Sequence, residues 1–242
     1  MRRFLATALL GAFACAGATA GRLPSAAPDP NCPAPSRWLV EHFIGADCDV
    51  CWQASPDAAP GAEDIPDAGW SLDWIAPAAS GADNPALPEA LPEARERLAR
   101  LGPYLPARLE AAPAGFDGLA PLTPPPAARR LTVHSSLPYH GYFGVQMHAR
   151  GLWPAGATGW MALVENLRAG TSGSALPRHV VRVLVGPLAL PAGPGTADAV
   201  APLFALRWPE TARPDRIMAA AWIEDRAGRI VQITSDRCKD PR

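Results

Sequence analysis

The sequence predicts an α/β segment followed by an all-β segment. In the first part, an apolar stretch over residues 38–44 is typical of a buried strand, and apolar residues at helical spacing follow over 87–101. From residue 129 onward, short apolar stretches alternate with turn residues, which is typical of an antiparallel sandwich. A proline-rich break over residues 113–128 separates the two parts.

The first twenty residues have the pattern of an export signal. Two arginines precede an apolar stretch over residues 4–14, and small residues ending at Ala20 form a typical cleavage site. We therefore expect cleavage near Ala20 and a periplasmic or secreted protein. A lipoprotein cut before Cys15 is the alternative, which Ala12 and Phe13 disfavour.

Composition limits the classes of partner. Without the two arginines of the leader, 20 basic residues stand against 23 acidic ones, a net charge of −3 that argues against nucleic acid. Beyond the leader no apolar stretch is long enough to cross a bilayer, so we expect no stable membrane insertion. The 29 prolines among 242 residues are more than twice the usual share of about 5%, which predicts few helices.

The elements of the first part follow from their spacing. After a tether over residues 21–36 and the first strand, prolines break the segment 53–69, so any helix there is short or absent. Alternation predicts a second strand over 70–76. The clearest helix ends at Leu101, with Glu–Arg pairs four residues apart on its outer face.

Seven strands are expected in the second part, and residues 224–229 form a hairpin turn between the last two. They cover residues 131–135, 142–149, 159–165, 179–190, 203–208, 217–224 and 230–234.

Cys48 and Cys51 follow the first strand directly after its end at Gly45. A strand, a turn and two cysteines three apart are typical of a thioredoxin-like redox site. Cysteines at i and i+3 of a helical first turn bring their sulfurs close enough to bond, and the N–H groups of that turn favour a thiolate at Cys48. Zinc is the alternative ligand, but the chain has no second pair of this kind.

Four cysteines remain after the leader, and an even number in an exported protein indicates two disulfides. Three pairings are possible. Proximity favours Cys48 with Cys51, which leaves Cys32 to pair with Cys238. The second bond would close nearly the whole chain and stabilise it by up to about 5 kcal/mol.

Further short segments recur in one known family. They are Val40-Glu41-His42-Phe43 before the two cysteines, Asp73-Trp74, Leu101-Gly102, Tyr104-Leu105-Pro106, Glu165-Asn166-Leu167, Gly170, Gly173, His179-Val180-Val181-Arg182 and Gly186-Pro187. With them the chain resembles an exported bacterial thioredoxin-like family of unknown function that has an all-β C-terminal extension. The resemblance implies a degenerate thioredoxin-like domain over 37–128 and a β-sandwich-like domain over 129–238.

The resemblance also implies two further site residues. Pro106 would be a cis-proline packed beside the disulfide, and Glu41 would lie beneath the cysteines and take the proton of Cys51. Together with Cys48 and Cys51 they form the expected catalytic set.

Several residues depart from the family pattern. Trp52 replaces a small residue or proline, Leu105 replaces a polar one, and Asp47 and Asp49 place negative charge beside Cys48. These departures predict a slow thiol.

The expected function is thiol–disulfide exchange with a protein partner outside the cytoplasm, without a cofactor or a resident metal. Two alternatives stay open. One is a secreted binding protein whose disulfides are structural, and the other is a metal carrier using Cys48, Cys51 and His42.

Overall fold

The computed structural model describes residues 32, 38–53, 69–78, 81–101, 115–121, 129–190 and 199–238. The predicted leader, most of the tether and Pro106 lie outside these residues. The elements are β1 (Trp38–Gly45), α1 (Asp49–Gln53), β2 (Gly69–Ala76), α2 (Glu93–Leu101), β3 (Gly115–Pro121), β4 (Arg130–Ser135), β5 (Tyr142–Arg150), β6 (Thr158–Leu167), β7 (Arg178–Ala189), β8 (Ala199–Val200), β9 (Phe204–Arg207), η4 (Pro214–Arg216), β10 (Ile217–Glu224) and β11 (Ile230–Ser235).

The expected fold class, a thioredoxin-like α/β domain followed by a β-sandwich-like domain, is wrong. The described residues are mostly strand with two α-helices, and they form a curled sheet in the order β11-β10-β6-β7-β2-β1-β3 and a smaller sheet of β4, β5, β8 and β9. Each predicted strand overlaps an observed one, although β3 and β8 were not predicted. Local patterning did not show which strands pair across the chain.

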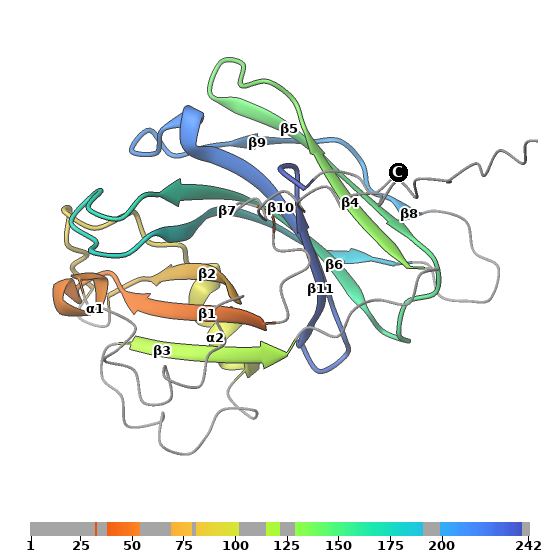
Figure 1. Ribbon diagram of the computed structural model, residues 1–242, viewed down its shortest axis with the longest axis horizontal. Helices are drawn as coiled ribbons and strands as arrows, with labels where there is room; N and C mark the ends of the chain where they lie inside the picture. Colours follow the sequence, from red (N-terminus) through yellow and green to blue (C-terminus); the bar gives the residue numbers. More distant parts are fainter. Residues whose placement is uncertain are drawn as a thin grey trace, which may run out of the picture.

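One sheet crosses the expected domain boundary near residue 128. β1 pairs with β2 in parallel and with β3 in antiparallel orientation, and β2 pairs in parallel with β7, where Asp73 lies opposite Val180. From β7 the sheet continues through β6 and β10 to β11 in antiparallel steps. Figure 1 shows this succession from β3 to β11.

The centre of the large sheet is buried on both faces. Along β10, Met218, Ala220 and Trp222 join the core on the α2 side, and the alternating residues pack against the smaller sheet. This alternation is the period of two expected for a strand. β10 has no polar face, which explains why it appears in the sequence as a continuous apolar run.

A disulfide joins Cys32 to Cys238, with an S–S distance of 2.04 Å. The pairing predicted from the cysteine count is confirmed. It ties the segment before β1 to the turn that follows β11, and therefore fixes both ends of the described chain to the same sheet.

A buried arginine connects the two ends of the large sheet. Arg97 of α2 was expected on the outer face of the helix, but it is fully buried. Its Nε and Nη2 donate to the two carboxylate oxygens of Glu41 at 2.9 and 2.7 Å. Its Nη1 lies 2.9 Å from Glu224 Oε1 and donates to the carbonyl of Gly228 at 2.7 Å. β1, α2, β10 and the β10–β11 turn therefore share one guanidinium.

Two carboxylates around one cation leave an excess of negative charge. Burial would lower the pKa of Arg97, but the charges of Glu41 and Glu224 raise it above its usual value. Burial raises the pKa of Glu224, and the charge of Arg97 and the Trp222 N–H offset only part of this effect. Glu224 is therefore the carboxylate whose ionisation destabilises the folded state.

We predict that two substitutions in this cluster destabilise the protein to very different extents. Arg97→Met leaves two buried carboxylates without a cation and should lower the free energy of unfolding by about 3–5 kcal/mol. Glu224→Gln keeps an acceptor for Trp222 and removes the excess charge, so it should lose less than about 1 kcal/mol at pH 7. Urea unfolding of both variants measures the difference, and equal losses would contradict this account.

Candidate functional site

Cys48 and Cys51 form a disulfide at the end of β1, with an S–S distance of 2.05 Å. A tight turn leads into it, in which the Cys48 N–H donates to the Gly45 carbonyl at 2.9 Å. Cys48 then caps α1, because its carbonyl accepts the Trp52 N–H at 3.1 Å and its Sγ accepts the Cys51 N–H at 3.3 Å. The bond to Sγ would also stabilise a thiolate there after reduction.

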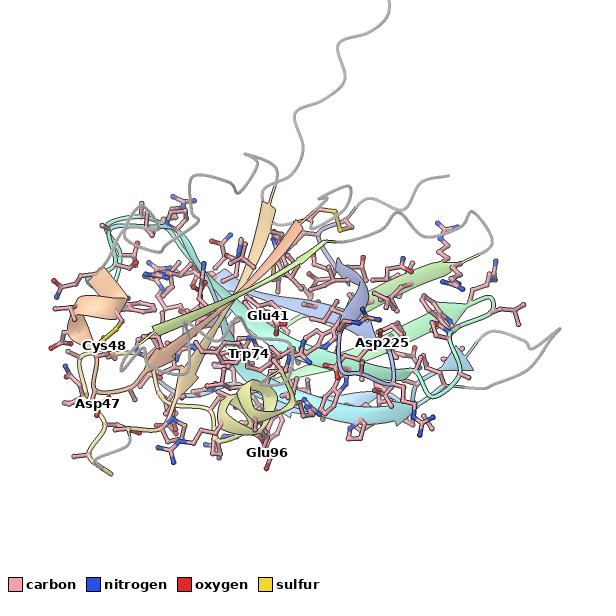
Figure 2. The ribbon with its side chains drawn as sticks, turned by 90° about the horizontal axis from the view of Figure 1, so that it is seen from below. Glu41, Asp47, Cys48, Trp74, Glu96 and Asp225 are labelled. Atoms are coloured by element: carbon pink, nitrogen blue, oxygen red, sulfur yellow. A yellow bond between two sulfur atoms is a disulfide. The ribbon has the colours of Figure 1, made fainter. Side chains whose placement is uncertain are left out.

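Figure 1 shows α1 at one end of the sheet, and Figure 2 shows Cys48 beside this helix. Cys48 is 9% exposed and Cys51 is half-buried, whereas Val50 between them is 74% exposed. Asp47 and Asp49 are exposed, and the amide of Asn84 donates to the Asp49 carboxylate at 2.6 Å. A partner would therefore meet an apolar tip flanked by solvated carboxylates.

Trp52 anchors α1 to the core. Its side chain is buried in a core with Ile44, Ile75, Leu167 and Val180. Its indole N–H donates to the carbonyl of Ser172 at 2.7 Å. The loop between β6 and β7, about 120 residues away in sequence, is therefore fixed against the turn that carries Cys48 and Cys51.

Arg178, the first residue of β7, contacts the backbone of α1. Its Nη2 donates to the Trp52 carbonyl at 2.9 Å and lies 3.4 Å from the Cys51 carbonyl. Its guanidinium carbon stands 5.2 Å from the centre of the Trp52 ring, within the range of a cation–π contact. Its Nε donates to the hydroxyl of Ser174 at 3.0 Å.

Asp73 of β2 is completely buried and pairs with this arginine. Its Oδ1 lies 3.1 Å from Arg178 Nη1 and 2.9 Å from His42 Nδ1, and its Oδ2 accepts the backbone N–H of His179 at 2.6 Å. Burial alone would raise the pKa of Asp73, but the His42 hydrogen bond, the charges of His42 and Arg178 and the His179 N–H lower it to about 2. The carboxylate is therefore ionised at neutral pH.

Glu41 lies elsewhere. Successive residues of a strand point to opposite faces of the sheet, so Glu41 is turned toward α2 while His42 points toward Asp73. Figure 2 shows Glu41 beside Trp74 in the middle of the molecule, well away from Cys48. Trp74 donates to its carboxylate at 3.1 Å. The structure thus brings Cys48 and Cys51 together but gives Glu41 other partners.

Sequence reasoning did not assign Asp73 or Arg178 to the site. Asp73 is the one charged residue of the mostly apolar strand β2, and Arg178 is the first residue of β7. A charge within a buried strand requires a partner, so this signal was available. The identity of the partner was not, because the two residues are 105 positions apart.

No protein-family model matches this chain, and neither a curated protein nor a solved structure matches it in the two further comparisons. Within the part of the chain that the structure describes, no helix is long and apolar enough to cross a membrane. The same residues contain no group of three or more His, Cys, Asp or Glu side chains arranged to hold a metal ion.

We predict that Asp73→Asn lowers the free energy of unfolding by about 3–5 kcal/mol at pH 7, because Arg178 loses its buried counterion. The pKa of Asp73 falls from 3.8 to about 2 on folding, so its contribution is complete above about pH 4 and is lost as the pH falls toward 2. The difference between variant and wild type should therefore shrink over this window in urea unfolding.

Asp215→Asn is the matched control, because Asp215 forms an exposed ion pair with Arg213. It should change stability by less than about 0.5 kcal/mol at either pH. A constant difference for Asp73→Asn from pH 7 to pH 2 would show that this carboxylate is not the titrating group.

Proposed function

We propose that the protein carries out thiol–disulfide exchange with a partner protein through Cys48 and Cys51. The observation that carries the proposal is the disulfide at the tip of β1, whose Cys48 sulfur accepts the Cys51 N–H. An extracytoplasmic location accompanies the proposal, because two disulfides and an export-type leader are typical of oxidising compartments.

In the reductive direction, the Cys48 thiolate attacks a disulfide of the partner, and one partner sulfur leaves as a thiolate. Cys51 loses its proton to solvent and attacks the Cys48 sulfur of the mixed disulfide. The second partner sulfur then leaves, so the partner gains two electrons and the Cys48–Cys51 disulfide forms. The oxidative direction reverses these steps. Glu41 has no part in them, because Arg97 holds both of its oxygens.

The surroundings of Cys48 support this assignment of roles. The Cys51 N–H increases the thiolate fraction at Cys48, and the carboxylates of Asp47 and Asp49 oppose it from exposed positions where solvent weakens their effect. The low exposure of Cys48 restricts access and predicts slow exchange with large partners.

A secreted binding protein with structural disulfides is the second candidate. The 9% exposure of Cys48 favours this candidate, because a structural disulfide does not need to be reached by a partner. The hydrogen bond from Arg178 to the Trp52 carbonyl also favours it, because it holds α1 in place. The two candidates differ in whether a covalent intermediate forms.

We predict that Cys51→Ser, expressed with its leader, accumulates a mixed disulfide with a partner protein through Cys48. Without Cys51 the intermediate cannot be resolved. Nonreducing gels of periplasmic or secreted material, followed by mass spectrometry of the linked peptide, measure the adduct.

Cys48→Ser keeps a free thiol at Cys51 and is the matched control, which should give at least about tenfold less adduct. If Cys51→Ser accumulates no adduct, the exchange function is wrong and the structural role remains.

A further inference from the structure

We infer that Arg178 is a positioning residue that shifts the redox equilibrium of the Cys48–Cys51 disulfide toward the reduced form. This inference rests on the exchange function proposed above.

The guanidinium of Arg178 has a fixed position beside α1. It is buried, and it joins the carbonyl of Trp52 on α1, the hydroxyl of Ser174 in the β6–β7 loop and the carboxylate of Asp73 on β2. Three separate segments thus hold one planar group in one orientation, a geometry suited to arginine rather than lysine. The end of α1 that carries Cys51 cannot shift without breaking these contacts.

Reduction of the disulfide also creates a negative charge near Arg178. Reduction replaces a neutral disulfide with a thiol and, at Cys48, a thiolate. Arg178 touches the backbone of the same short helix, with its Nη2 at 3.4 Å from the Cys51 carbonyl, whereas its counterion Asp73 lies on its Nη1 side. The cation is therefore placed between the disulfide turn and the buried carboxylate. Of this ion pair it is the cation that contacts the backbone of α1, and a positive charge held against that helix favours the thiolate.

The chain offers a matched control on the same strand. Arg182 is also buried on β7 and also pairs with a buried carboxylate, since its Nε and Nη2 donate to Glu165 Oε2 at 2.8 and 2.7 Å. Arg182 therefore pairs with β6, whereas Arg178 pairs with β2 and also contacts α1. Removal of either arginine thus costs a buried ion pair, but of the two it is Arg178 that contacts the helix carrying Cys51.

The experiment measures the equilibrium between the full-length protein and glutathione. Two reduced glutathione molecules convert the Cys48–Cys51 disulfide to two thiols and give one oxidised glutathione. Acid quenching, alkylation and mass spectrometry of the peptide containing Cys48 and Cys51 separate this bond from Cys32–Cys238. Thermal unfolding of each variant verifies that it is folded.

Arg178→Met should lower the equilibrium constant for reduction at least tenfold, which corresponds to about 30 mV for a two-electron couple. Arg182→Met should stay within about twofold of wild type, even if it loses as much stability. A loss of stability alone would affect both variants. The equilibrium constant for reduction distinguishes them, because a purely structural role of Arg178 would leave it unchanged.

If Arg178→Met does not fold, the double variant Arg178→Gln with Asp73→Asn takes its place, because removing both partners leaves neither charge buried without the other. The same direction of shift is expected. An unchanged equilibrium in a folded Arg178 variant, or an equal shift in Arg182→Met, would overturn the inference while exchange by the wild type survives. A wild-type disulfide that glutathione cannot reduce would remove the exchange function and this inference together.

Discussion

The buried carboxylate of Asp73 holds the two halves of the large sheet together. It lies where β2 meets β7, and it replaces part of the strand ladder by accepting the backbone N–H of His179 while it pairs with Arg178. The loss of such a buried pair costs about 3–5 kcal/mol, a large share of the stability of an ordinary domain. The same carboxylate therefore contributes to the continuity of the sheet and holds the arginine that contacts the backbone of α1.

Two ion-pair clusters on opposite faces of the same strands connect different parts of the structure. On one face Glu41, Arg97 and Glu224 connect β1 to α2 and β10, and on the other His42, Asp73 and Arg178 connect β1 and β2 to β7 and α1. The first cluster fixes the core around α2. The second fixes the turn that carries Cys48 and Cys51, so a substitution can be directed at one cluster without touching the other.

Local patterns in the sequence were sufficient for most of the strands, for both disulfides and for the position of Cys48 and Cys51 at the end of β1. They were insufficient for the fold class, because period and composition do not specify which strands pair across a hundred residues. They also missed β3, which lies within a proline-rich segment. The role expected for Glu41 came from a resemblance, and the sequence carried no sign of its partner Arg97.

The most direct test is the rate at which iodoacetamide alkylates Cys48 in the reduced protein as the pH is raised. If Cys48 is a working thiol supported by the Cys51 N–H and by Arg178, the rate should reach half its maximum clearly below the model value of roughly pH 8.5. A midpoint at or above that value would mean that the surrounding charges do not activate the sulfur, and that the disulfide is structural.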